Sequence, residues 1–140
     1  MPAEAPRRAA TEDTGSGTVL VVEDNPEVLA AASEMLQALG YSIATASNAA
    51  DALAILHSGR EVDVLFSDVL LPGGMLGEAL AREAQRMRPG LRVLLTSGYA
   101  GSADAAEAGM VFLAKPYRRA ELAEKLREAM RRPAGPVRPG

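Results

Sequence analysis

The sequence predicts an α/β fold in which five parallel strands, in the order 2-1-3-4-5, have helices on both faces of the sheet. Four short apolar runs each end in polar residues, which is typical of strands that are buried on both faces. These runs are residues 19–24, 62–68, 92–97 and 111–116. Segments with apolar residues at helical spacing separate them, and this alternation favours right-handed crossovers in a doubly wound, flavodoxin-like sheet.

Length and composition restrict the class of protein. The chain has 140 residues, enough for one domain with a sizeable core. It has no cysteine, which excludes a disulfide framework and thiolate chemistry. The net charge of -3 gives no general attraction for nucleic acid or for an anionic membrane surface. No long apolar stretch predicts a signal peptide or a membrane span, so we expect a cytoplasmic protein that binds neither nucleic acid nor membrane.

The domain is expected at residues 18–132, between two flexible tails. Residues 1–17 are rich in small and polar residues without periodicity. Residues 133–140 contain too much Pro and Gly for a helix or a strand. We therefore expect no output domain after the last helix.

The first half of the domain contains two helices with recognisable starts. Asn25 is expected to accept hydrogen bonds from free backbone amides at the start of the first helix. Pro26 suits the first helical position, because its missing N–H would have no partner there. Gly40 favours the end of this helix. A second strand is expected at residues 41–46, and Asn48 is expected to cap the helix that follows it.

The second half contains three further helical segments. After a Pro-Gly-Gly turn at residues 72–74, we expect a helix at residues 78–87. A short Ala-rich segment at residues 103–108 follows the fourth strand. The last helix follows the fifth strand and presents one apolar face, made of Leu122, Leu126, Ala129 and Met130.

Acidic residues follow the strands that flank the expected switch point of the sheet. The carboxyl ends of parallel strands meet at one edge, so Glu23, Asp24 and Asp68 should converge there. Two carboxylates about 5 Å apart repel by roughly 3 kcal/mol at an effective dielectric near 20. A cation can neutralise them, and an all-oxygen set suits Mg²⁺. Lys115 and Ser97 would add a positive charge and a hydroxyl, which leaves Asp68, on the central strand, as the expected nucleophile for a phosphoryl group.

These residues resemble those of the CheY-like receiver domains of two-component response regulators, and the resemblance covers about residues 18–131. It implies that Glu23 and Asp24 bind Mg²⁺ together with Asp68 and the backbone carbonyl of Leu70. It also implies roles for positions in the second half of the chain. Asp68 would be the phosphorylated aspartate, and Ser97 would supply the hydroxyl that moves toward the phosphoryl group. Phe112 would be the aromatic switch residue. Lys115 would be the lysine that contacts the phosphoryl group, and Pro116 the cis-proline that follows it.

The resemblance implies a phosphorylation-controlled signalling domain, not an enzyme in the ordinary sense. A histidine kinase or a histidine phosphotransfer protein would donate the phosphoryl group to Asp68, and the domain itself would hydrolyse the product. The conformational change would control an unknown downstream protein target. We expect a single-domain response regulator, and the alternative is the carboxyl-terminal receiver of a hybrid sensor histidine kinase.

Two other classes compete with this interpretation. A phosphatase that forms an aspartyl phosphate would need a second aspartate two positions after Asp68, where this chain has Leu70. A degenerate receiver that only binds partners would not need the full set of acceptor residues.

The sequence leaves one role open and departs from the family in two places. Thr96 and Ser97 are adjacent and point to opposite faces of a strand, so either could supply the switch hydroxyl, although Gly98 after Ser97 favours Ser97. The turn after Asp68 is one residue longer than the commonest receiver pattern. Lys115 follows Ser97 by only 18 positions, which predicts a shortened fourth helix.

Overall fold

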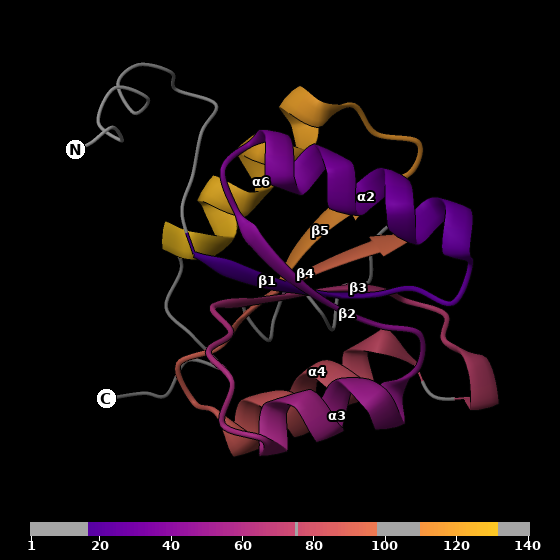
Figure 1. Ribbon diagram of the computed structural model, residues 1–140, viewed down its shortest axis with the longest axis vertical. Helices are drawn as coiled ribbons and strands as arrows, with labels where there is room; N and C mark the ends of the chain where they lie inside the picture. Colours follow the sequence, from indigo (N-terminus) through magenta and orange to yellow (C-terminus); the bar gives the residue numbers. More distant parts are fainter. Residues whose placement is uncertain (1–16, 75, 98–109, 132–140) are drawn as a thin grey trace.

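Five parallel strands form one sheet in the order β2-β1-β3-β4-β5, as predicted (Figure 1). The structure is a computed structural model that describes residues 17–74, 76–97 and 110–131. Every paired neighbour in the sheet runs parallel. The strands are β1 (Thr18–Val22), β2 (Ser42–Ala46), β3 (Val64–Asp68), β4 (Arg92–Ser97) and β5 (Val111–Ala114).

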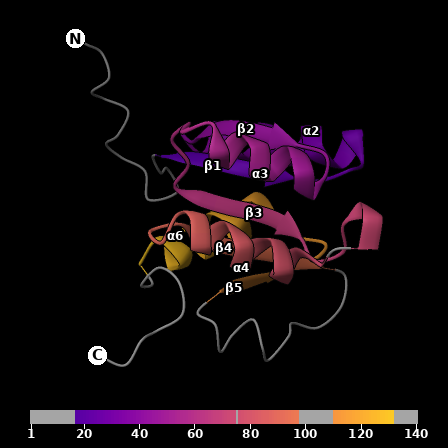
Figure 2. The same cartoon turned by 90° about the horizontal axis from the view of Figure 1, so that it is seen from below.

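Helices cover both faces of the sheet. Figure 1 shows α2 and α6 above the sheet and α3 and α4 below it, and the view from below in Figure 2 shows α3 and α4 side by side across the strands. The described residues form four α-helices and one 3-10 turn. These are α2 (Pro26–Ala38), α3 (Ala49–His57), η1 (Pro72–Gly74), α4 (Gly77–Met87) and α6 (Arg119–Arg131).

The predicted helix caps are confirmed. The side-chain oxygen of Asn25 accepts hydrogen bonds from the amides of Glu27, at 2.9 Å, and Val28, at 3.2 Å. Asn48 accepts one from the amide of Asp51 at 2.8 Å. Gly40 has a φ of 100°, a conformation that favours glycine after a helix.

Several element boundaries differ from the prediction, for example at β3, which begins at Val64 and not at position 62. The second strand begins at Ser42 and not at position 41, because the amide of Tyr41 donates to the carbonyl of Leu36 and so still belongs to the end of α2. Helix α4 begins one residue early, at Gly77. The expected helix at residues 103–108 lies outside the described residues, as do residues 1–16 of the first expected tail and all of the second.

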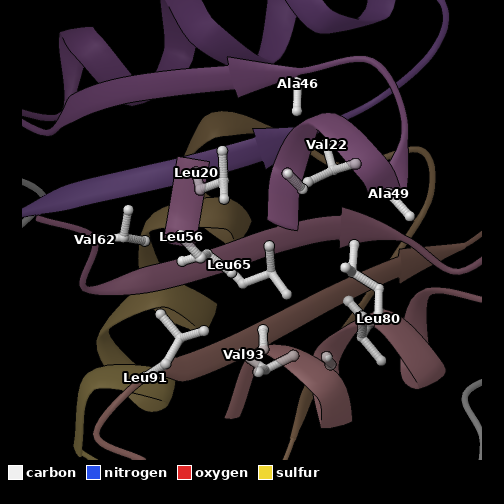
Figure 3. Packing of buried hydrophobic residues seen from close by; sticks show 14 of the residues in the cluster. Leu20, Val22, Ala46, Ala49, Leu56, Val62, Leu65, Leu80, Leu91 and Val93 are labelled. Atoms are coloured by element: carbon white, nitrogen blue, oxygen red, sulfur yellow. The ribbon is translucent and has the colours of Figure 1, made fainter. Parts of the chain in front are cut away.

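Two hydrophobic clusters lie on the two faces of the sheet. Figure 3 shows Leu20, Leu65 and Val93 of three strands facing Leu56 of α3 and Leu80 of α4. The opposite cluster contains the alternate strand residues and the inner sides of α2 and α6: Val19, Val21, Val64, Phe66, Leu94, Leu36, Leu122 and Leu126. Neighbouring residues of one strand therefore enter different clusters.

Across residues 17–74, 76–97 and 110–131, no helix combines the length and the apolar character needed to cross a bilayer.

Candidate functional site

The strand register brings the polar strand ends to one edge of the sheet. Asp68, the last residue of β3, lies opposite Thr96 of β4. Ser97 lies opposite Ala114 of β5, and its carbonyl accepts a hydrogen bond from the amide of Lys115 at 2.9 Å. Glu23 follows directly after β1, which pairs with β3 on its other side. Three neighbouring strands and β5 thus deliver the predicted residues to the same place.

Asp68 and Lys115 form an ion pair at the centre of this edge. The ammonium of Lys115 donates to Oδ2 of Asp68 at 2.8 Å, and the amide of Leu70 donates to Oδ1 at 3.3 Å. The side chain of Asp68 is 16% exposed and that of Lys115 is 31% exposed. Asp68 is therefore held from inside the protein and still reaches solvent.

Glu23 is the buried carboxylate of the group. Its side chain is 9% exposed, Oε2 accepts a hydrogen bond from the amide of Asn25 at 3.0 Å, and Oε1 lies 4.0 Å from the ammonium of Lys115. Burial raises the pKa of Glu23 above 4.5, and the charges of Asp68 and Asp24 raise it further. The hydrogen bond from Asn25 and the charge of Lys115 act in the opposite direction. The three carboxylates therefore interact electrostatically.

Asp24 does not form a cluster of metal ligands with Glu23 and Asp68. It follows Glu23 in the chain and is exposed. Within the described part of the chain, no three acidic, His or Cys side chains are grouped as metal ligands. The positive charge that faces Asp68 in the structure is the ammonium of Lys115.

The donor chemistry of this edge nevertheless suits Mg²⁺. This ion commonly takes one or two carboxylates and keeps several waters, so it does not need three protein ligands. Burial and then the charges of Asp68 and Asp24 raise the pKa of Glu23, and a divalent cation would relieve the repulsion between the carboxylates. Asp24 and Asp68 are the accessible oxygen donors, and Glu23 lies behind them.

Leu70 lies in the loop that follows β3. The residue is 57% exposed, and it forms an isolated antiparallel bridge with Leu76, which is 47% exposed. Its amide contacts Asp68, whereas a metal contact through its carbonyl stays a prediction. The two leucines give the rim of the site an apolar character.

Thr96 and Ser97 are both buried, but they lie on opposite faces of the sheet. Leu94, two residues before Thr96, packs in the cluster beneath α2 and α6, whereas Leu95, two residues before Ser97, packs in the cluster beside α3 and α4. Thr96 accordingly lines a cavity with Asp68, Lys115 and residues of the cluster beneath α2 and α6, such as Phe66. Ser97 is 4% exposed and ends β4 beside β5. The switch role of Ser97 stays a prediction.

The predicted cis-proline is present, since the peptide bond between Lys115 and Pro116 is cis. Phe112, on β5, is half-buried and packs against the cluster beside α3 and α4. This position is compatible with an aromatic switch, but the switch itself stays a prediction.

The sequence interpretation missed Tyr117. Its ring makes an edge contact with Phe66, with centroids 6.1 Å apart and an angle of 61° between the rings. Burial, followed by the charges of Glu23 and Asp68, raises the pKa of Tyr117 to about 12. The phenol therefore stays protonated beside the acidic groups. Its place directly after Lys115 and Pro116 was the signal that could have revealed it.

Gly77 has a structural role that the sequence analysis did not assign. A Cβ atom at this position would lie 2.3 Å from the backbone oxygen of Asp68. The amide of Gly77 also donates to the carbonyl of Val69 at 2.6 Å. Close packing of the start of α4 against the end of β3 thus requires glycine.

A groove opens beside the site. It has a volume of about 590 Å³ and lies between α2 and the segment after β5. Lys115 lines this groove as well as the cavity under Asp68. The remaining lining residues are mostly apolar: Glu27, Val28, Ala31, Ala32, Met35, Pro116 and Tyr117.

Comparison with known proteins agrees with the fold. Residues 19–127 match the response regulator receiver domain family. Over 126 residues the chain is 38% identical to the sensor kinase CckA of Brucella abortus (strain 2308), covering 86% of this chain and only 13% of that protein.

Solved receiver domains have the same fold. The receiver domain of the hybrid histidine kinase CckA is 32% identical, with a TM-score of 0.70 over 82% of this chain and 100% of that one. A CheY-like receiver domain from Methanospirillum hungatei JF-1 is 27% identical, with a TM-score of 0.73 over 83% of this chain and 94% of that one. Because the family match runs from β1 into α6 and includes every strand, this chain belongs to the receiver domain family of two-component response regulators.

Proposed function

We propose that this domain accepts a phosphoryl group on Asp68 from a histidine kinase or a histidine phosphotransfer protein, and that the modified domain controls a downstream protein. The ion pair between Asp68 and Lys115, 2.8 Å long and open to solvent on one side, is the observation that carries the proposal. We further propose that the domain works in the cytoplasm as a phosphoacceptor and not as an enzyme with an external substrate.

In the transfer step, a bond forms between a carboxylate oxygen of Asp68 and phosphorus while the bond between phosphorus and the donor histidine nitrogen breaks. Lys115 neutralises the carboxylate before the step and supplies positive charge for a phosphoryl oxygen after it. Asp24 and Asp68, with Glu23 behind them, would hold the Mg²⁺, which supplies positive charge to the phosphoryl oxygens when it is bound.

The signal would then travel along β4 and β5. Ser97 ends β4, and Phe112 lies on β5 near the site, so a phosphoryl group on Asp68 could bias both side chains. Leu70, two positions after Asp68, has no proton to give, which supports an acceptor role over that of an acid-assisted phosphatase. Water would still hydrolyse the aspartyl phosphate slowly.

The groove beside α2 is the proposed docking place for the phosphoryl donor. It is continuous with the acceptor, because Lys115 borders both. Its apolar lining suits a helix of a histidine-bearing partner whose histidine reaches Asp68 over the rim.

A mass measurement after incubation with acetyl phosphate and Mg²⁺ tests the proposal. We expect the wild type to gain one phosphoryl group and Asp68→Asn to gain none. Asp51→Asn, which changes an exposed aspartate on α3, is the matched control and should behave as the wild type. An adduct of the same size on Asp68→Asn would remove the assignment of the acceptor.

A second context has support of its own. Similarity to the receiver domain of a hybrid histidine kinase, and to 13% of the length of a sensor kinase, favours a receiver attached to a kinase. The chemistry at Asp68 would be the same, and the donor histidine would belong to the same polypeptide. The coding sequence on either side of this segment distinguishes a single-domain regulator from a hybrid kinase.

A further inference from the structure

Thr96 is a buried polar residue whose hydroxyl has no visible partner. The residue is 5% exposed, and within the described part of the chain its Oγ1 makes no hydrogen bond. Buried hydroxyls in folded proteins nearly always bond to protein or to an ordered water, because water is lost on burial and must be replaced. The hydroxyl of Thr96 therefore requires a partner that the side chains around it do not supply.

Thr96 and Asp68 line the same small cavity. Thr96 lies opposite Asp68 in the strand register, and the cavity is also lined by Glu23, Lys115 and Tyr117. Its volume is about 10 Å³, which is about the space that one water molecule needs. A buried water also needs two to four polar partners, and these lining residues provide carboxylate, ammonium and phenol groups.

An apolar filling of the cavity is the competing possibility. Val21, Phe66 and Ala32 form part of its wall. However, a dry cavity would leave the hydroxyl of Thr96 unpaired next to charged groups, where the cost of an unpaired group is greatest. A single water satisfies the hydroxyl and fits the volume.

We propose that this cavity is a binding site for one ordered water, which is held by Oγ1 of Thr96 and links it to the ion pair of Asp68 and Lys115. Thr96 is then a positioning residue: it acts on the acceptor through the water and does not touch the phosphoryl group. This second part rests on the proposed function, whereas the water site does not.

Crystal structures of the wild type and of Thr96→Val, determined at a resolution that shows ordered water, test the site itself. Valine has the shape of threonine without the hydroxyl. We expect a water within hydrogen-bond distance of Oγ1 in the wild type and none in the variant. A wild-type cavity without water, or a water that stays in the variant, would overturn the proposal.

The rate of labelling by acetyl phosphate with Mg²⁺ tests the positioning role. We expect Thr96→Val to be labelled about tenfold more slowly, as is common when a supporting hydrogen-bond partner is removed. Thr96→Ser keeps the hydroxyl and should restore the rate to within about twofold of the wild type. Thr45→Val makes the same chemical change at an exposed position of β2 and should leave the rate unchanged.

The two measurements separate the two claims. If the wild type takes up no phosphoryl group, the proposed function fails, and the crystal structures still decide whether the water site exists. If the wild type is labelled and Thr96→Val is labelled equally fast, the positioning role is wrong although the receiver function stands. Slow labelling of Thr96→Ser as well would also contradict a role for the hydroxyl, since only side-chain size would then matter.

Discussion

The two carboxylate oxygens of Asp68 have different surroundings. Oδ2 is bound to the ammonium of Lys115 at 2.8 Å, whereas Oδ1 has a longer contact of 3.3 Å with the amide of Leu70. The charge-assisted bond is the stronger of the two. Oδ1 therefore has the weaker hydrogen bond of the two oxygens. The position of the backbone around Oδ1 then affects its access to a phosphoryl donor.

Gly77 controls that backbone by its lack of a side chain. We expect Gly77→Ala to lower the free energy of unfolding by about 2 kcal/mol, because the added methyl group would lie 2.3 Å from the backbone oxygen of Asp68. The shift of β3 that relieves this contact should also slow labelling by acetyl phosphate. Urea unfolding and labelling rates measure the two effects.

Gly90→Ala is the matched control for this substitution. A Cβ atom at Gly90 would meet nothing within 4 Å. Its effect on the free energy of unfolding should stay within about 0.5 kcal/mol. Equal losses in the two variants would show that the contact with Asp68 is not the cause.

Glu23 should make the stability of the metal-free protein depend on pH. Burial raises the pKa of Glu23 in the folded protein above 4.5. Its contribution to stability is therefore fully present below the pKa of the unfolded chain and is lost as the pH rises through the higher folded-state pKa. Without divalent cations, we expect Glu23→Gln to be more stable than the wild type at pH 7.5, with the difference disappearing near pH 4.

Urea unfolding in the presence of a chelator, at both pH values, checks this expectation. Glu34→Gln removes an exposed carboxylate of α2 and serves as the control. A variant Glu23→Gln that is less stable than the wild type at pH 7.5 would mean that the hydrogen bond from Asn25 and the charge of Lys115 outweigh burial and repulsion.

At the scale of elements, β1 and α2 form one unit with the site. The amide of Asn25 donates to Glu23, and the side chain of Asn25 caps α2. The same helix then forms one wall of the groove that Lys115 borders. Changes on this helix can therefore affect partner binding without altering the acceptor.

Ala31→Glu tests that separation. Ala31 is exposed on α2 and lines the groove, so a glutamate there keeps a good helix former while it places charge against an apolar partner. We expect phosphoryl transfer from an autophosphorylated histidine kinase that labels the wild type to fall about tenfold, the equivalent of 1.4 kcal/mol. Labelling by acetyl phosphate should be unchanged.

Ala30→Glu is the control on the neighbouring position. Ala30 is exposed on the same helix but does not line the groove. Its transfer rate should equal that of the wild type. If both variants lose transfer equally, general charge repulsion is the cause and the groove is not the docking place.

The sequence was most informative where a structure depends on neighbouring residues. The caps at Asn25 and Asn48 follow from side chains that reach amides two or three residues later, so local reading predicted them. The start of β2 was misplaced by one residue, because the bond from Tyr41 to Leu36 depends on how the chain leaves α2. The close contact of Gly77 with Asp68 depends on packing of α4 against β3 and was not visible.

At the scale of the whole molecule, one divalent cation should stabilise the fold, because it binds an edge that exists only in the folded sheet. We expect the melting temperature to rise with Mg²⁺ concentration. The gain is about 2.7 kcal/mol when free Mg²⁺ is 100 times its dissociation constant. Asp24→Asn and Asp68→Asn should each reduce the shift. Scanning calorimetry with and without Mg²⁺ at matched ionic strength measures it.

Sodium chloride at the same ionic strength is the control for general screening of charge. A shift of equal size in Asp68→Asn would contradict a site at this edge. So would a shift that sodium chloride reproduces in full.

The topology was predictable from the alternation of strands and helices, and it alone placed Asp68 and Lys115 near each other. The details of the site were not predictable from the sequence, because they depend on side-chain geometry. The metal-binding role predicted for Glu23, Asp24 and Asp68 stays a prediction. The sequence did not reveal that Asp24 is exposed while Glu23 is buried, or how closely Asp68 pairs with Lys115. The cavity beneath Thr96 depends on how strands and helices far apart in the sequence pack, which no local pattern encodes.

The lysine of the acceptor pair directly follows β5, the strand at one edge of the sheet, and α6 packs against that strand. Ribosomes deliver a chain from its amino terminus, so Asp68 emerges well before Lys115. A nascent polypeptide therefore carries an aspartate without its counter-charge until the end of the domain is made. If the proposed function holds, Asp68 can accept a phosphoryl group with its counter-charge in place only after the segment that carries Lys115 has been translated.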